Sequence, residues 1–229
     1  MIEEPPVLKV RRNFPRPTAD QIATLSGTPT GFVADAMDGR GALGPEIRPV
    51  DPDKATFCGA ALTCYAGPGD NLAVLAAIAE AQAGDVIVSA SDGYLMTAVV
   101  GDRLTGMARN KGAVGMVIDG CVRDVAGIKA SGLPCFAAGT TPNSPASSGP
   151  GTVGLPITLA GESVHSGDLV IGDADGIVIV PFAQIDDVIG RLAAIRQLEE
   201  ELDAKVAAGL AVPDFIRELM ASDKVQVVD

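Results

Sequence analysis

The chain has 229 residues, of which 47% are hydrophobic and 20% charged, and this composition excludes an intrinsically disordered protein. Its 17 lysines and arginines against 29 aspartates and glutamates give a net charge of −12, which argues against binding to a nucleic-acid phosphate backbone. A single histidine excludes a His-rich zinc site and most Ser-His-Asp triads.

The N-terminal region resembles neither a signal peptide nor a membrane segment. Residues 1–17 mix Glu, Arg and Pro, and the longest apolar run, Leu72 to Ala79, is far shorter than the about 20 residues of a membrane helix. We therefore expect a cytoplasmic protein without a membrane partner. The four cysteines form no Cys-x-x-Cys pair, and Cys58, Cys64 and Cys135 have the apolar neighbours typical of reduced core thiols.

The order of predicted elements indicates an α/β fold. After a loose arm at residues 1–17, short helices are predicted from Thr18 and over 32–37. Strands and helices then alternate, in the order 55–66 (strand), 71–83 (helix), 85–89 (strand), 96–111 (helix), 113–118 (strand), 123–131 (helix) and 134–137 (strand). This alternation predicts a parallel sheet whose strands are joined by helical crossovers.

The remainder of the chain has a different pattern. Residues 140–150 are rich in Pro, Ser, Thr and Gly and predict a loop. Three strand regions follow without helices between them, at 151–160, 168–172 and 177–181. One long helix with an apolar stripe is predicted after them, at 182–209. We expect three segments, namely an N-terminal arm at 1–17, an α/β/β domain at 18–181 and a C-terminal helical extension at 182–229.

Ionisable side chains directly follow one buried strand, where Ile118–Asp124 carries Asp119, Arg123 and Asp124. Ligands usually bind at the carboxyl ends of parallel strands. A carboxylate beside a guanidinium offers an oxygen ligand for Mg²⁺ or Mn²⁺ and a fork for a substrate carboxylate or enolate oxygen. The alternative is an Asp that caps the next helix, beside a surface Arg. Cys121 is a poor candidate nucleophile, because no His lies near it in the sequence.

A second candidate segment, Val99–Leu104, lies near the start of the predicted helix 96–111. Gly101 lets an anion approach the backbone, and the free N–H groups of a first helical turn bind carboxylates. The Asp102 carboxylate can accept a hydrogen bond and so hold a water molecule. The alternative is that Asp102 has no role in a site and only interacts favourably with the helix dipole.

Three glutamates, Glu199, Glu200 and Glu201, follow the apolar stripe of the long C-terminal helix. A run of charges at such a place is usually a solvated helix face. The alternative is that one of the three, which the sequence does not single out, reaches a site on a neighbouring subunit.

The motifs resemble those of the RraA-like family over roughly residues 20–205. They are Gly84-Asp85, Gly101–Leu104, Lys111-Gly112, Val117–Asp124, Gly132–Pro134, Ser166–Asp168 and Asp173–Pro181. That family includes class II aldolases acting on 4-hydroxy-4-methyl-2-oxoglutarate and 4-carboxy-4-hydroxy-2-oxoadipate, and shorter regulators that inhibit ribonuclease E. The resemblance implies a compact α/β/β fold of the swivelling β/β/α type, assembled as a homotrimer or hexamer.

The resemblance also implies roles for single residues. In the aldolases the Asp that matches Asp124 holds a divalent metal, Mg²⁺ or Mn²⁺, and the Arg that matches Arg123 contacts the substrate. The pyruvyl carboxylate is received by a row of four residues, here Gly101, Asp102, Arg103 and Leu104. An upstream acid matches Asp35, with Asp38 as a competing candidate, although the aldolases often have Glu there.

Asp102 and a Glu of the neighbouring subunit, most nearly Glu199, are the acids that hold water in the aldolases. With Arg123, they complete the catalytic set that the resemblance implies. The 182–229 extension is then expected to contact the neighbouring subunit.

We therefore expect a carbon–carbon lyase that cleaves a 4-hydroxy-2-oxo acid to pyruvate and a second oxo acid, with oxaloacetate decarboxylation as a side activity. Neither strand-end segment contains a lysine that could form a Schiff base, which disfavours a class I aldolase. The alternative is a non-catalytic regulator of ribonuclease E, which does not need the C-terminal glutamates. The individual substrate, the preferred metal, and the choice between trimer and hexamer stay open.

Overall fold

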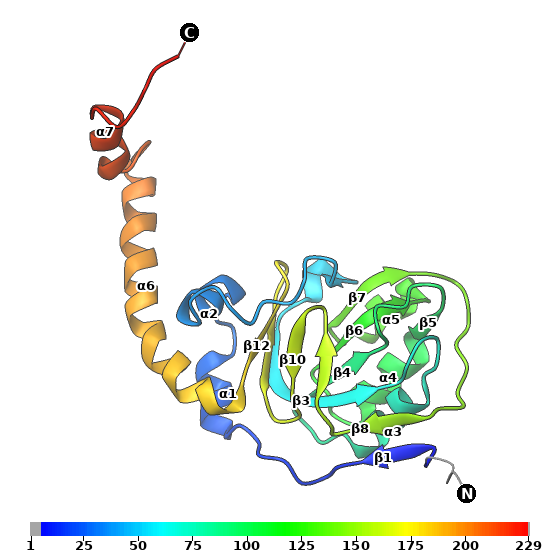
Figure 1. The fold of residues 1–229 in the computed structure, drawn as a ribbon. Coiled ribbons are helices and arrows are strands. Elements are labelled where there is room, and N and C mark those ends of the chain that lie inside the picture. The colour runs from blue at the N-terminus through cyan, green and yellow to red at the C-terminus, as the bar shows by residue number, and fades with distance from the viewer. Residues whose placement is uncertain (1–5, 229) are drawn as a thin grey trace, which may run out of the picture.

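The computed structural model describes residues 6–228, and its body is a sheet with helices packed on it (Figure 1). The first half of the chain forms β1 (Leu8–Val10), α1 (Ala19–Leu25), α2 (Thr30–Ala36), β2 (Arg48–Pro49), β3 (Phe57–Tyr65), α3 (Leu72–Glu80), β4 (Asp85–Ala90), β5 (Ala98–Val100) and α4 (Asp102–Asn110). The second half forms β6 (Gly115–Val122), α5 (Val125–Ser131), β7 (Cys135–Thr140), β8 (Gly151–Val153), β9 (Ile157–Leu159), β10 (Glu162–Val164), β11 (Leu169–Gly172), β12 (Ile177–Val180), α6 (Ile185–Ala207) and α7 (Asp214–Met220).

The parallel sheet predicted from the sequence is confirmed. Strands β3, β4, β6 and β7 are neighbours in that order, and each adjacent pair is parallel. Helices α3, α4 and α5 connect them in chain order. The carboxyl ends of these strands, and the segments that leave them, therefore lie along one edge of the sheet.

Alternation along the central strands builds two apolar layers. In β4, Ile87 lies in the cluster that includes the buried faces of α3, α4 and α5. Its neighbours Val86 and Val88 lie in a second cluster, on the face covered by the β9–β10 hairpin. Side chains two residues apart share a face of a strand, so this central strand is buried on both sides.

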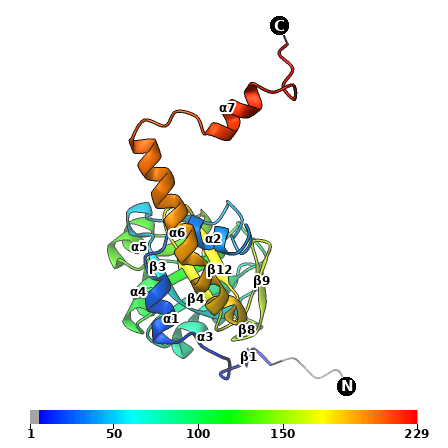
Figure 2. The same ribbon diagram turned by 90° about the vertical axis from the view of Figure 1, so that its left-hand side faces the viewer.

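A third apolar cluster attaches the C-terminal helix to the body. Ile185, Val188 and Leu192 of α6 are buried against α1, α2 and the antiparallel β11–β12 pair. The apolar stripe predicted from the sequence thus packs on its own chain. Beyond it, the C-terminal arm (residues 198–228) projects away from the body in both ribbon views (Figures 1 and 2).

The helix predicted over 96–111 is wrong in its first turn. Residues Ala98–Val100 instead form β5, which pairs in parallel with the end of β6. Val99 and Val100 are buried there, as β-branched residues in strands often are. Gly101 follows with extended backbone (φ −140°) and is the N-cap of α4, so helix and strand meet at this glycine.

Two further predictions need correction. The arm over 1–17 is not loose throughout its described part, because β1 pairs in parallel with β8 and Arg16 forms an ion pair with the buried Asp85. Residues 1–5 of that arm lie outside the described residues. The strand predicted to end at residue 118 continues to Val122, which places Asp119 inside the strand.

Three of the four cysteines are buried, whereas Cys58, which the sequence also predicted as a core thiol, is half-buried. Burial raises the pKa of the Cys64 and Cys135 thiols to about 12, so both stay protonated near neutral pH. All four cysteines of the chain are free thiols. Within residues 6–228, no helix combines the length and apolarity that crossing a bilayer needs.

Candidate active site

The candidate site lies where two neighbouring parallel strands end. Arg123 and Asp124 follow β6 directly, and Gly101 follows β5. The two strand ends are tied together by a hydrogen bond of 3.0 Å from the Arg123 amide to the Val100 carbonyl oxygen. The two segments singled out in the sequence therefore share one edge of the sheet.

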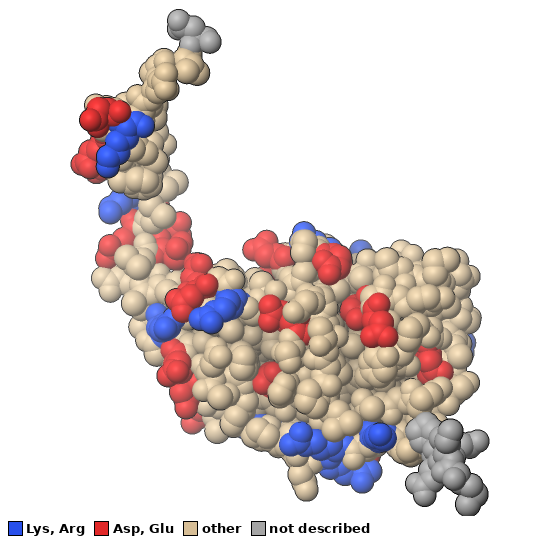
Figure 3. Space-filling model, in the orientation of Figure 1, with Lys and Arg blue, Asp and Glu red and all other residues tan. Residues whose placement is uncertain are grey.

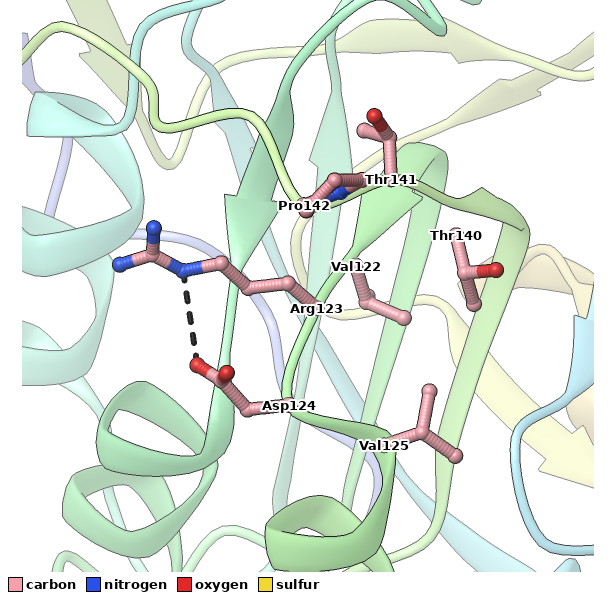
Figure 4. Close-up of a pocket in the computed structure, with 7 residues that line it drawn as sticks. All are labelled: Val122, Arg123, Asp124, Val125, Thr140, Thr141 and Pro142. Carbon is pink, nitrogen blue, oxygen red and sulfur yellow. Dashed lines mark ion pairs between the residues drawn. The ribbon is translucent and has the colours of Figure 1, made fainter.

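Arg123 and Asp124 form an ion pair at the centre of the site, with 3.4 Å between the Arg123 Nε and the Asp124 Oδ2 (Figure 4). The side chains remain 39% and 51% exposed, so a ligand can reach both. Asp124 has left-handed backbone angles (φ 58°, ψ 43°) at the N-cap of α5, yet its side chain makes no capping hydrogen bond. Asp124 thus occupies the N-cap position that the helix-capping alternative predicts, but its carboxylate makes no capping hydrogen bond and lies beside Arg123 instead.

Gly101 lies in close contact with this pair. A Cβ at Gly101 would lie 3.0 Å from the Asp124 Oδ2 and 3.4 Å from the Arg123 Cγ. Gly101 is also the N-cap of α4, so the first backbone N–H groups of that helix lie near Asp124. Amides in a first helical turn have no intrahelical acceptor and bind anions well.

Replacing Gly101 by alanine is therefore expected to disturb the site without unfolding the protein. The added methyl group displaces the Asp124 carboxylate or the Arg123 stem, because the contact at 3.0 Å is tighter than an ordinary van der Waals contact. We expect turnover to fall by about tenfold, which corresponds to about 1.4 kcal/mol, with an unchanged circular dichroism spectrum. Gly106→Ala is the matched control, since a Cβ there meets nothing within 4 Å. Full activity of Gly101→Ala would contradict this account.

Asp102 lies half-buried between α4 and α5. A Cβ at Gly127 of α5 would lie 2.6 Å from the Asp102 Oδ2, so the two helices approach this closely only because Gly127 has no side chain. Within residues 6–228, the Asp102 carboxylate has no hydrogen-bond donor from the protein. It is therefore available to accept a hydrogen bond from water or a ligand.

Two cavities adjoin at the Arg123–Asp124 pair. The first has a volume of about 370 Å³ and is lined by Gly101, Asp102, Arg103, Leu104, Arg123 and Asp124. The second, of about 310 Å³, is lined by Val122, Arg123, Asp124, Val125, Thr140, Thr141 and Pro142 (Figure 4). A single chain thus brings together six of the eight candidate site residues.

Asp35 and Glu199 are not part of this arrangement within one chain. Asp35 is exposed on α2, and Glu199 lies in the C-terminal arm, where acidic side chains gather (Figure 3). Helices α2 and α6, which carry Asp35 and Glu199, lie across the body from α4 and α5 (Figure 1). Asp38, the competing candidate, pairs with Arg191 of α6 at 2.9 Å, and that hydrogen bond lowers the pKa of Asp38.

Asp119 has a structural role. It is 6% exposed and accepts hydrogen bonds from the Ser91 amide (2.6 Å), the Ser91 hydroxyl (2.8 Å) and the Gly93 amide (3.1 Å). These bonds fix the segment that leaves β4. Cys121 is also buried, and burial raises the pKa of its thiol, which argues further against a nucleophile.

Ser144 is a site residue that the sequence did not indicate. Its Oγ accepts a hydrogen bond of 2.6 Å from the Arg123 Nη1. It comes from the loop of residues 141–150, about 20 residues beyond Arg123 along the chain. Only the polar composition of that loop is visible in the sequence, and composition does not reveal a tertiary contact.

The sequence profile of the RraA-like family, described as Aldolase/RraA, matches residues 30–179. The chain belongs to the RraA-like family. A Halalkalibacterium halodurans relative, provisionally named 4-hydroxy-4-methyl-2-oxoglutarate aldolase, is 38% identical over 182 residues, covering 80% of this chain and 86% of its own. Its name suggests a lyase acting on a small molecule.

Solved RraA-like structures share the fold. An uncharacterised protein from Pseudomonas syringae pv. tomato is 27% identical with a TM-score of 0.76, and the match covers 86% of this chain and 92% of that one. RraAS2 of Streptomyces coelicolor, described as an unusual member of the RNase ES inhibitor RraA family, is 27% identical with a TM-score of 0.74, covering 83% and 100%. Because the family includes both aldolases and RNase regulators, function has to be argued from the site.

Proposed function

We propose that this RraA-like protein is a divalent-metal-dependent class II aldolase that cleaves a 4-hydroxy-2-oxo acid to pyruvate and a second oxo acid. The convergence of Arg123, Asp124 and the first turn of α4 on one cavity of about 370 Å³ carries the proposal. The adjacent carboxylate and keto oxygens of a 2-oxo acid suit amide donors next to a guanidinium. The name of the Halalkalibacterium halodurans relative supports the same reaction class.

The first turn of α4 binds the substrate carboxylate. The amides of Asp102 and Arg103 lie at the start of the helix, beyond the Gly101 N-cap, and the helix dipole favours a negative charge there. The keto carbon then lies towards Arg123. Binding at backbone amides fixes the orientation of the substrate without a flexible side chain.

Arg123 stabilises the negative charge that develops on the keto oxygen. When the C3–C4 bond breaks, its electron pair forms the enolate of pyruvate, and the negative charge moves to that oxygen. The C4 hydroxyl loses its proton and becomes the carbonyl of the second oxo acid. A guanidinium held in place before reaction stabilises this charge without reorganisation.

Proton transfer is assigned to water held by Asp102, together with Glu199 of a neighbouring subunit. The water takes the proton of the C4 hydroxyl, and a proton is then returned to C3 of the enolate to give pyruvate. The Asp102 carboxylate suits this role because it is half-buried and meets no protein donor among residues 6–228. Loss of CO₂ from oxaloacetate gives the same enolate, so we expect that side activity.

The donors at the site fit a hard cation that keeps part of its water shell. Among residues 6–228 no group of three or more His, Cys, Asp or Glu could hold a metal, which disfavours a protein-encased Zn²⁺ or Ca²⁺ site. Asp124, half-exposed beside an open cavity, would hold Mg²⁺ or Mn²⁺ through one carboxylate. When bound, the ion supplies Lewis-acid polarisation of the keto oxygen.

Removal of divalent metal is therefore expected to lower pyruvate release by more than tenfold. Protein treated with EDTA and freed of chelator should regain activity when Mg²⁺ or Mn²⁺ is added, and Asp124→Asn should respond much less. Pyruvate is measured with a coupled lactate dehydrogenase assay. Full lyase activity after EDTA treatment would contradict the assignment.

The walls of the second cavity predict a preference between the two named substrates. Val122, Val125 and Pro142 line it together with two threonines, and Arg123 is its only cation among the described residues. The two substrates differ at C4, where one has a methyl group and the other a carboxymethyl group. The carboxymethyl substrate therefore has a third carboxylate where the other has a methyl group. Beside these walls that extra charge lacks a partner, so the methyl substrate should be preferred.

We expect kcat/KM for 4-hydroxy-4-methyl-2-oxoglutarate to exceed that for 4-carboxy-4-hydroxy-2-oxoadipate by about tenfold, or about 1.4 kcal/mol. Val125→Lys should shift this ratio towards the carboxylated substrate, and Val125→Met should not. Equal values for the wild-type protein would exclude this role for the second cavity.

The proposed function is tested with a panel of 4-hydroxy-2-oxo acids and oxaloacetate, each with Mg²⁺ and with EDTA. Structural similarity to RraAS2 favours a second candidate, a regulator of an RNase E-type ribonuclease. Inhibition of that ribonuclease by folded protein that releases no pyruvate from any substrate would favour the regulator. Metal-dependent pyruvate release would favour the aldolase.

A further inference from the structure

The hydroxyl group of Ser144 forms a hydrogen bond with a terminal nitrogen of the Arg123 guanidinium. The Ser144 Oγ accepts from the Arg123 Nη1 at 2.6 Å, while the Asp124 Oδ2 lies 3.4 Å from the Arg123 Nε. The guanidinium is thus contacted at two of its three nitrogens, by a hydrogen bond at Nη1 and by an ion pair at Nε. Within residues 6–228 the Arg123 Nη2 has no hydrogen-bond partner, so its donors remain for a ligand.

The loop that supplies Ser144 is anchored before and after it. We call residues 141–150 the polar loop. On one side of Ser144, the Asn143 amide group donates to the Met96 carbonyl (2.8 Å), and the Ala98 amide donates to the Asn143 carbonyl (3.0 Å). These bonds attach the polar loop to β5 and to the residues that precede it.

Asp70 anchors the polar loop on the other side of Ser144. Asp70 is 9% exposed, and its Oδ2 accepts from the amides of Ser148 (2.6 Å) and Gly149 (3.0 Å). Its Oδ1 accepts from the Leu72 amide (2.8 Å), which fixes the carboxylate to the start of α3. An exposed serine on a surface loop is ordinarily mobile, but this one is held from both directions.

We propose that Ser144 is a positioning residue for Arg123, and that the anchored polar loop exists at this point to hold it. A long arginine side chain loses rotamer freedom when it fixes a substrate oxygen. The Ser144 hydroxyl restricts that freedom before substrate arrives, so the donors of Arg123 are already oriented when charge develops. For turnover this inference rests on the proposed function, but the orientation of Arg123 does not.

The orientation of Arg123 is measured without substrate. Protein labelled with ¹⁵N-arginine gives an Nε–Hε signal for Arg123, assigned by its loss in Arg123→Lys. We expect restricted motion of this group in the wild type, greater motion in Ser144→Ala, and restoration in Ser144→Thr, which keeps the hydroxyl. Ser148→Ala is the control, since the Ser148 hydroxyl makes no hydrogen bond within the described chain and its amide bond to Asp70 is kept.

Kinetics add a second readout. Ser144→Ala should lower kcat by about tenfold with a smaller change in KM, because the lost orientation matters most when charge develops on the substrate. In an Arg123→Lys background the same substitution should have no further effect, since Ser144 acts through the guanidinium. Ser144→Thr should recover most of kcat, and Ser148→Ala should match the wild type.

Two results would overturn the inference. One is an Arg123 signal with the same mobility in Ser144→Ala and the wild type. The other is an active wild-type enzyme whose kcat does not change in Ser144→Ala. A wild-type protein without lyase activity on the whole panel would instead refute the proposed function, and the NMR comparison would still decide the positioning of Arg123.

Discussion

Replacing Arg123 by lysine is expected to lower kcat/KM for pyruvate release by more than tenfold, or more than about 1.4 kcal/mol of transition-state stabilisation. The guanidinium offers a planar fork, whose edges are held by Ser144 at Nη1 and by Asp124 at Nε. A lysine ammonium is a point charge with no such fixed geometry. It cannot keep the contact with Ser144 and also span two oxygens of the substrate.

Arg123→Ala should be more severe, by about 100-fold to 1000-fold, the range found when one donor to a developing oxyanion is removed. Arg109→Lys is the matched control, because Arg109 is exposed in the last turn of α4 and does not line the cavity. Circular dichroism and oligomeric size should be the same for all three variants. A loss of less than tenfold in Arg123→Lys would place Arg123 at the periphery of the site.

The sequence was sufficient to predict the parallel core. Strands such as Asp85–Ala90 are short apolar runs separated by helical patterns, and this alternation has few three-dimensional solutions. It was not sufficient to detect β5. Three residues directly before a helix continue a helical pattern, and only the pairing of Ala98 with Cys121 shows that they form a strand.

The sequence predicted those site residues that directly follow the ends of neighbouring strands. Gly101, Arg123 and Asp124 meet because the strands before them are parallel neighbours. Composition could not separate Asp124 from Asp119, which lies within β6 and binds the amides of Ser91 and Gly93. The difference between a structural carboxylate and an available one is set by the donors around it, and these come from distant segments.

The C-terminal arm raises the question of how Glu199 could act at a site across the body. Truncation after Arg196 should leave a folded protein, because the buried residues Ile185, Val188 and Leu192 remain. If the arm completes a site on a neighbouring subunit, this truncated chain should lose more than tenfold in turnover, or more than about 1.4 kcal/mol. Glu199→Ala should behave likewise, while Asp203→Ala, on the exposed part of the same helix, should not.

Mixed oligomers test the shared site directly. Subunits carrying Glu199→Ala are combined with subunits carrying Arg123→Ala, each of which should be inactive alone. After subunit exchange at equal amounts, about a quarter of the sites pair an intact Arg123 with an intact Glu199 of the neighbour, so about a quarter of wild-type activity should return. Recovery would also explain why one chain separates Arg123 and Glu199. No recovery after verified exchange, or full activity of the Glu199→Ala oligomer, would leave Glu199 as part of a solvated helix face.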